Sequence, residues 1–173
     1  YSRPATEAMR WGNLLEPAVV ERLRDDGHEI EYPLYLTLTD PERPWLNGHP
    51  DGFVTLDGQN ALLEVKTVGG WAHRANGAGV PLHHVAQVQH YFHLTGTKRA
   101  LFAALVNGQH LETHEVARDD RAIGLLLEAA ERFHWHVVTD TQPPIGPTDS
   151  DREALALLYP DASEARRVRL DAE

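Results

Sequence analysis

The dipeptide Asp57-Gly58, set between two short runs of alternating apolar residues, constrains the fold of this chain more than any other feature. Two-residue hairpin turns need positive φ at both central positions, and Asp-Gly pairs supply it. We therefore predict antiparallel strands at Asp51–Leu56 and Ala61–Thr67. One face of this hairpin carries a continuous apolar set suited to a core: Val54, Leu56, Ala61, Leu63 and Val65.

The other face of the hairpin gathers three charged residues. A two-residue turn puts Asp51 directly opposite Glu64, with Lys66 two residues further along on the same face. If the loop instead comprises residues 57–60, Asp51 faces Lys66. Both registers keep the three charges on one side of the sheet.

Two carboxylates held a few ångströms apart repel, and a raised pKa or a bound divalent cation relieves that repulsion. Mg²⁺ fits best, and Mn²⁺ can substitute, because these ions prefer oxygen ligands such as the two carboxylates and the Val65 carbonyl. A lysine beside them can orient or deprotonate the attacking water. The pattern favours metal-assisted phosphodiester hydrolysis; the alternative is an ordinary solvated strand face.

The remaining periodicity gives a simple order of elements. A helix is expected from about Thr6 to Arg24, and because Pro17 interrupts it, Glu16 either begins a second helix or lies at a kink. The order is α-β-β-β-α-β-β-α, a mixed central sheet flanked by helices in the α/β (α+β) class. The other predicted elements are a strand at His28–Thr39, a helix at Leu82–Thr95, strands at Arg99–Val106 and Gln109–Val116 around Asn107-Gly108, and a helix from Asp119 or Asp120 to about His136.

The C-terminal part differs in composition. From Thr141 the chain is rich in proline and reads as a linker, followed by a short helix near Asp151–Leu158. We therefore predict one domain over residues 1–139 and a linker with a helical tail over 140–173.

Composition excludes several classes of protein. The formal net charge of -10 argues against binding nucleic acid through bulk electrostatics, so a DNA partner needs a locally positive channel. The absence of cysteine excludes disulfides, thiol nucleophiles and Cys-type zinc sites. His110 and His114 lie too far apart on one strand to share a zinc ion.

No apolar run could span a membrane and no leader is evident, so we expect a soluble, cytoplasmic protein.

Four sequence blocks together resemble a known family. Pro50-Asp51 followed by Glu64-Val65-Lys66, behind a helix that carries glutamate, resembles the PD-(D/E)XK nuclease superfamily with its restriction-endonuclease-like core. The match to the YqaJ-type viral recombinases, which are phage recombination exonucleases similar to lambda exonuclease, covers roughly residues 8–135. Its blocks are Met9-Arg10-Trp11-Gly12 with Leu15-Glu16, Pro50-Asp51-Gly52, Leu63-Glu64-Val65-Lys66 and Ala86-Gln87-Val88-Gln89.

The resemblance implies roles for these residues. Asp51, Glu64 and the Val65 carbonyl would bind the catalytic metal, Lys66 would serve the water, and Glu16 would complete a two-metal site.

The resemblance also implies DNA contacts. Gln87 and Tyr91 share one helix face and would point toward the site or the DNA. His49 stands where lambda exonuclease has a small hydroxyl residue, and would donate to a phosphate or merely pack. In the glycine-rich loop, Trp71 could stack on an unpaired base and Arg74 could contact a phosphate, or the tryptophan anchors its own loop. The histidines of the predicted helix are expected to be solvated or to touch phosphate: His83, His84, His90 and His93.

The function implied by the resemblance is a Mg²⁺-dependent exonuclease that acts 5′ to 3′ on linear duplex DNA and makes single-stranded tails for an annealing protein. A homo-oligomeric ring would reconcile DNA binding with the acidic composition, and the compartment would be the cytoplasm of a bacterial host. Two alternatives stay open: a related nuclease with another substrate, such as an endonuclease or a single-strand exonuclease, and a catalytically silent protein that binds DNA ends.

Overall fold

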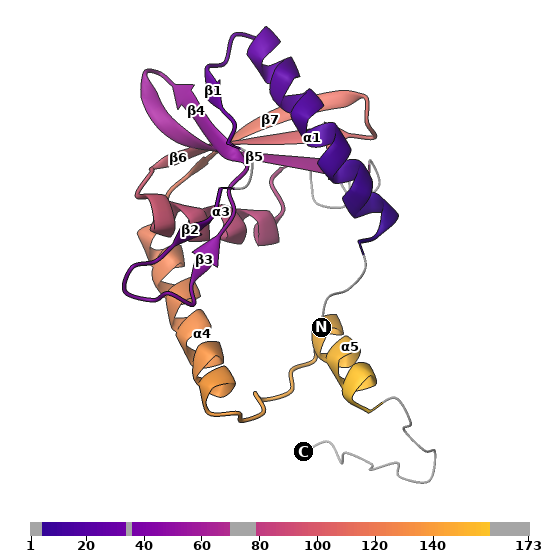
Figure 1. Ribbon diagram of the computed structural model, residues 1–173, viewed down its shortest axis with the longest axis vertical. Coiled ribbons are helices and arrows are strands. Elements are labelled where there is room, and N and C mark those ends of the chain that lie inside the picture. Colours follow the sequence, from indigo (N-terminus) through magenta and orange to yellow (C-terminus); the bar gives the residue numbers. More distant parts are fainter. Residues whose placement is uncertain (1–4, 34–35, 70–78, 160–173) are drawn as a thin grey trace. The chain divides into compact units, whose positions relative to one another are not determined.

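The structure is a computed structural model that describes residues 5–33, 36–69 and 79–159 (Figure 1). It divides into two compact units, residues 1–129 and 130–173. The domain boundary expected after residue 139 stays a prediction, because compact units do not define a functional domain. Its elements are α1 (Glu7–Asp25), β1 (Ile30–Glu31), β2 (Leu38–Thr39), β3 (Asn47–Gly48), β4 (Gly52–Leu56), β5 (Gln59–Val68), α3 (Leu82–Thr95), β6 (Arg99–Val106), β7 (His110–Ala117), α4 (Asp120–Val138) and α5 (Asp149–Leu158).

A five-stranded mixed sheet forms the centre of the first unit, with strand order β1-β4-β5-β6-β7. Strands β5 and β6 run parallel, whereas the other neighbours are antiparallel. A parallel pair needs a long crossover connection, and the chain between β5 and β6 includes α3. The predicted mixed sheet flanked by helices is confirmed.

The β4–β5 hairpin has the two-residue turn. Leu56 pairs with Gln59, and the turn residues Asp57 and Gly58 have φ of 50° and 72°. Because this register fixes which residues share a face, it puts Asp51 and Glu64 on the same side of the hairpin and rules out the four-residue loop.

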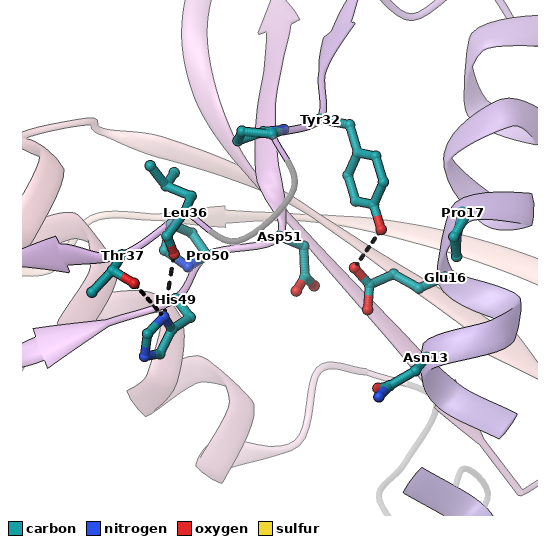
Figure 2. A pocket seen from close by; sticks show the side chains of 10 residues that line it. Asn13, Glu16, Pro17, Tyr32, Leu36, Thr37, His49, Pro50 and Asp51 are labelled. Carbon is teal, nitrogen blue, oxygen red and sulfur yellow. Dashed lines mark hydrogen bonds between the residues drawn. The ribbon is translucent and has the colours of Figure 1, made fainter. Parts of the chain in front are cut away.

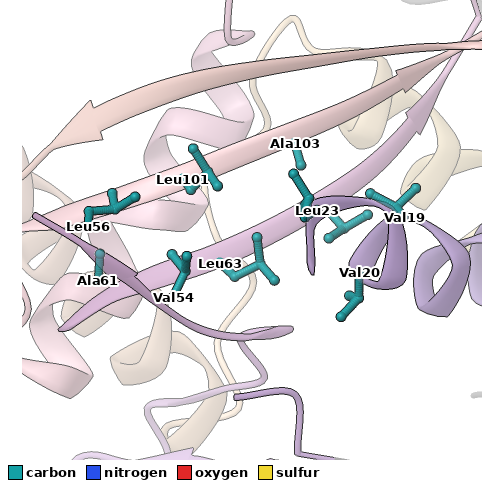
Figure 3. Close-up of a cluster of buried hydrophobic side chains, with 10 residues drawn as sticks. Val19, Val20, Leu23, Val54, Leu56, Ala61, Leu63, Leu101 and Ala103 are labelled. Atoms are coloured by element: carbon teal, nitrogen blue, oxygen red, sulfur yellow. The ribbon is translucent and has the colours of Figure 1, made fainter. Parts of the chain in front are cut away.

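Two hydrophobic clusters cover the two faces of the sheet. On one face, α1 packs against the hairpin residues that the alternation predicted for the core (Figure 3). On the other face, α3 and the start of α4 pack over Leu62 and Phe102. Since both faces are covered, the interpretation of the charges as a solvated strand face is wrong. The α1 cluster comprises Val19, Val20, Leu23, Val54, Leu56, Ala61, Leu63, Val65, Leu101 and Ala103.

Two expectations for the N-terminal third are wrong. Helix α1 continues through Pro17, so no second helix begins at Glu16, because the buried Val19, Val20 and Leu23 hold its C-terminal half on the sheet. The alternative, a kink at Glu16, stays a prediction. The strand expected at His28–Thr39 is two separate strands.

The split of that strand has one local cause and one cause that depends on a distant segment. Pro33 has no N–H to continue the β1 ladder. Strand β2 pairs with β3 in a second, two-stranded sheet that the sequence did not suggest.

The later elements follow their turn and cap residues closely. Helix α3 ends at Gly96, whose φ is 72°. Asp119 caps the start of α4 by accepting hydrogen bonds from the N–H groups of Arg121 and Ala122 at 2.9 and 3.1 Å. In the second unit, Thr148 caps α5 in the same way. Within the described residues, no helix is long and apolar enough to cross a membrane.

Candidate active site

The predicted catalytic residues of the hairpin meet where β4 begins beside β5. Asp51 directly precedes β4, and its Oδ2 accepts a hydrogen bond from the Val65 N–H at 2.7 Å. Glu64 lies within β5 with its side chain 1% exposed. The Lys66 Nζ donates to Glu64 Oε1 and, at 3.2 Å, to the Val65 carbonyl oxygen. The second carboxylate oxygen of Glu64 is buried and has no hydrogen-bond partner among the described residues.

The surroundings of the buried Glu64 and the half-buried Asp51 disfavour the ionised form of each carboxylate. Burial raises the pKa of Asp51 to about 6, against the opposing effects of Lys66 and the Val65 N–H. Burial, and then the charge of Asp51, raise the pKa of Glu64 to about 7 even though Lys66 lies beside it. Burial alone would lower the pKa of Lys66, but the charges of Glu64 and Asp51 raise it, so Lys66 is a cation at neutral pH.

Glu16 reaches the same place from α1. It lines a cavity of about 570 Å³ together with Asp51, Tyr32 and His49 (Figure 2). Its Oε1 accepts a hydrogen bond from the Tyr32 hydroxyl at 3.0 Å. The negative charge of Glu16 contributes to the raised pKa values of Asp51 and Glu64, so three carboxylates lie within electrostatic reach of one another.

The expected DNA contacts have different surroundings. Gln87 Nε2 donates a hydrogen bond to the Tyr91 hydroxyl at 2.9 Å. The charges of Glu64 and Lys66 contribute to the pKa of Tyr91, so this pair on α3 lies beside the site. His49 Nδ1 lies 3.2 Å from the Thr37 hydroxyl and 3.3 Å from the Leu36 carbonyl oxygen (Figure 2). Its Nδ1 is therefore engaged with the segment that precedes β2. Trp71 and Arg74 lie outside the described residues.

Sequence reasoning gave no role to Tyr32 and no particular role to His84. His84 lies three residues before Gln87 on α3, and this spacing is the one sequence feature that places the two side chains on the same helix face. Burial, and then the nearby His83 and Lys66, lower the pKa of His84, while Gln87 hydrogen-bonds to it. Nothing in the sequence marked Tyr32, because its place depends on how β1 pairs with β4.

Two other histidines of α3 hold the β2–β3 hairpin. His90 Nε2 lies 2.9 Å from the Asn47 carbonyl oxygen, and His93 Nε2 lies 2.6 Å from Asp40 Oδ2. The same Asp40 carboxylate accepts two backbone N–H groups of its turn. Because the hairpin leads directly into Pro50-Asp51, these contacts help to fix where β4 starts.

The donor set fits a small divalent cation. All the expected ligand atoms are oxygens, which small divalent cations prefer. One carboxylate oxygen of Glu64 is buried and has no hydrogen-bond partner among the described residues. The Lys66 ammonium already places a positive charge against Glu64 and the Val65 carbonyl oxygen. Within residues 5–33, 36–69 and 79–159, no three His, Asp or Glu side chains form a ready metal cluster. Mg²⁺ tolerates such a site, because it commonly binds one or two carboxylates and keeps several waters.

Solved structures share this fold. The alkaline exonuclease LHK-Exo from Laribacter hongkongensis matches with a TM-score of 0.68 and 19% identity over 90% of this chain and 78% of that one. A phage-related exonuclease from Haemophilus somnus 129PT matches with a TM-score of 0.57 and 12% identity over 80% of this chain and 75% of that one. The mixed sheet flanked by helices is thus an architecture that this chain shares with solved exonucleases.

The sequence also shows to which family the chain belongs. Residues 2–98 match the YqaJ-like viral recombinase domain, and the chain belongs to that family. A curated relative, the uncharacterized protein YqaJ of Bacillus subtilis (strain 168), is 26% identical over 176 residues, which cover 99% of this chain and 54% of the relative. The chain therefore spans about half the length of that relative. The resemblance drawn from the sequence blocks is confirmed.

Proposed function

We propose that this chain is a Mg²⁺-dependent deoxyribonuclease that hydrolyses phosphodiester bonds as an exonuclease, 5′ to 3′ on linear duplex DNA. One observation carries the proposal: Asp51, Glu64 and Lys66 meet at the start of the β4–β5 hairpin, and Glu16 lines a cavity together with Asp51. Membership of a viral recombinase family and a fold shared with exonucleases support it. One of the solved LHK-Exo structures contains dAMP, and it matches this chain with a TM-score of 0.67 at 18% identity.

Asp51, Glu64 and the Val65 carbonyl would hold Mg²⁺, or Mn²⁺ in its place, and Glu16 would serve a second ion. When bound, the metal polarises the phosphate and lowers the pKa of a bound water. The Val65 N–H keeps Asp51 oriented, since it donates to Oδ2 and leaves the other carboxylate oxygen for a ligand. The ligand set thus combines β5, the residue that precedes β4, and helix α1.

Lys66 acts as a fixed cation in this proposal. Its raised pKa keeps it protonated at neutral pH, so it would neutralise charge that develops on the phosphate and hold the attacking water in place. Gln87, Tyr91 and His49 would contact the substrate. Contacts of Trp71 and Arg74 with DNA are proposed from the sequence alone.

The acidic composition limits how DNA is held. With a net charge of -10, non-specific attraction along the whole surface is unfavourable, so the DNA end would be held by local contacts at the site. A homo-oligomeric ring and a single-strand annealing protein as partner are parts of the proposal that a single chain does not test.

The first experiment compares 5′-phosphorylated linear duplex with covalently closed circular DNA, each in Mg²⁺ or EDTA. Wild type is tested beside Lys66→Ala and Lys98→Ala, which is a matched control because Lys98 is the second lysine of the sequence and is exposed. We expect digestion of linear DNA in Mg²⁺ by wild type and Lys98→Ala. We expect a loss of at least about 100-fold in Lys66→Ala and no digestion in EDTA.

Other outcomes would redirect the assignment. Nicking of the circle would identify an endonuclease, and digestion of single strands alone would identify a single-strand exonuclease. No cleavage of either DNA, with retained binding to duplex ends, would indicate a catalytically silent end-binding protein. Equal loss in both lysine variants would contradict the role given to Lys66.

A further inference from the structure

The hydrogen bond between Tyr32 and Glu16 joins two elements that are distant in sequence at the wall of the cavity. The Tyr32 hydroxyl lies 3.0 Å from Glu16 Oε1. Figure 2 shows the other oxygen of Glu16 turned away from the tyrosine, with Asp51 across the cavity. One carboxylate oxygen is thus held by the protein, and this fixes the direction of the other.

The position of Tyr32 depends on a close approach between backbones. Strand β1 ends at Glu31, which pairs with Phe53 of β4. A Cβ atom on Gly52 would lie 2.5 Å from the Glu31 carbonyl oxygen and 3.5 Å from the Tyr32 Cα. The glycine after Asp51 therefore admits the end of β1, and Tyr32 follows it to the same edge of the sheet.

Tyr32 is suited to donate a hydrogen bond and not to lose its proton. Burial, and then the hydrogen bond and charge of Glu16, raise the pKa of Tyr32 to about 12, with a smaller contribution from Asp51. In the hydrogen bond the Tyr32 hydroxyl donates and Glu16 Oε1 accepts, because a carboxylate has no proton to donate. Tyr32, Glu16 and Asp51 all line the same cavity.

We propose that Tyr32 is a positioning residue whose hydroxyl orients the Glu16 carboxylate toward the Asp51 side of the cavity and thereby sets the metal affinity that depends on Glu16. This inference rests on the proposed function, because Glu16 matters only if it serves a metal ion. Partners of metal-binding groups commonly change metal affinity by about 10- to 100-fold when they are removed.

A purely structural role is the alternative. The Tyr32 ring packs against the cluster that holds α1 on the sheet, so the residue could simply anchor the helix. Tyr32→Phe separates the two roles, because it keeps the ring and removes only the hydroxyl. Tyr159→Phe is the matched control, since Tyr159 is 61% exposed and lies in the second unit.

The experiment measures Mn²⁺ binding by titration calorimetry and by the electron paramagnetic resonance of free Mn²⁺. The samples are wild type, Tyr32→Phe, Glu16→Gln, the double variant and Tyr159→Phe. We expect Tyr32→Phe to weaken Mn²⁺ binding about 10-fold and to add no loss in the Glu16→Gln background. Tyr159→Phe should bind as wild type does, and thermal unfolding of the same samples reports whether each variant is folded.

Three results would overturn the inference, and one of them also overturns the proposed function. If Glu16→Gln weakens Mn²⁺ binding but Tyr32→Phe does not, Tyr32 has no positioning role. If Tyr32→Phe causes the same loss with and without Glu16, it does not act through that residue. If wild type neither binds Mn²⁺ nor cleaves DNA, the proposed function fails and the role of Tyr32 fails with it.

Discussion

Replacing Glu64 by glutamine should stabilise the metal-free protein at alkaline pH, although Glu64 is a proposed metal ligand. The folded protein raises the pKa of Glu64 from 4.5 to about 7, mainly through burial. A carboxyl group with a raised pKa contributes stability that is full below its unfolded pKa and is lost as the pH rises through its folded pKa. For Glu64 alone, this loss between pH 5 and pH 8 is about 2–3 kcal/mol.

Glutamine keeps the shape of the side chain and a hydrogen-bond acceptor for Lys66, but it never becomes charged. In EDTA, we expect Glu64→Gln to match wild type near pH 5 and to exceed it by about 2 kcal/mol at pH 8. Asp51, whose pKa is raised to about 6, titrates over the same range in both proteins and leaves a smaller residual pH dependence.

Urea denaturation followed by circular dichroism, at pH 5, 6, 7 and 8, measures the free energy of unfolding. The exposed Glu128 on α4 supplies the control, because Glu128→Gln should change the free energy by less than about 0.5 kcal/mol at every pH. The reasoning is refuted if Glu64→Gln is less stable than wild type at pH 8, or if the difference between the two does not grow with pH.

Three further predictions concern other parts of the molecule. Excess Mg²⁺, at about 100 times its Kd, should raise the free energy of unfolding of wild type at pH 8 by about 3 kcal/mol. An equal Mg²⁺-dependent stabilisation of Asp51→Asn, measured by thermal unfolding, would contradict the role of Asp51 as a metal ligand. Gln89 is 3% exposed, donates a hydrogen bond to the Ala117 carbonyl and accepts one from the Asp119 N–H. Gln89→Ala should therefore lower the free energy of unfolding in urea by about 2–3 kcal/mol, and a loss below about 0.5 kcal/mol would show that these hydrogen bonds do not stabilise the fold. Gly52→Ala should lower the free energy of unfolding by about 1–3 kcal/mol, because its Cβ would lie 2.5 Å from the Glu31 carbonyl oxygen. The control is Gly124→Ala in α4, where the new Cβ has open space, so the substitution should be neutral or slightly stabilising. Equal effects of the two substitutions would refute the close approach of β1 to Gly52.

The parts of the fold that the sequence predicts well are those fixed by local chemistry. Asp57-Gly58 sets the register of the β4–β5 hairpin, and Gly96 ends α3 at the expected residue. Once the register is known, the alternation of the hairpin assigns its core face without further information. The same register places Asp51, Glu64 and Lys66 in one group, so local sequence is enough to predict that these three side chains meet.

The parts that the sequence does not predict depend on contacts between distant segments. The split of the strand expected at His28–Thr39 reflects pairing of β2 with β3, whose two residues Asn47 and Gly48 carry no strand signal. Tyr32 reaches the cavity only because β1 pairs with β4, and no local pattern near Tyr32 encodes that pairing. Glu16 stands out only through family resemblance, since an isolated helix glutamate has no distinguishing periodicity.

The two glutamines of α3 show why a motif alone does not assign roles. Gln87 and Gln89 are two residues apart, so they lie on different faces of the helix. Gln87 contacts Tyr91 beside the site, whereas Gln89 is buried and links α3 to the end of β7 and the start of α4.

The surroundings of Glu64 join stability and function in one residue. Its neighbours Leu63 and Val65 are buried on the α1 face of the sheet, and its partner in β6, Phe102, is buried on the α3 face. A carboxylate at this place is desolvated by the two clusters that hold the fold together, and this is the main cause of its raised pKa. A cation bound there would recover the cost of that desolvation. The same burial that destabilises the metal-free protein at alkaline pH should therefore strengthen metal binding, so neutral variants of Glu64 should gain stability and lose metal affinity together.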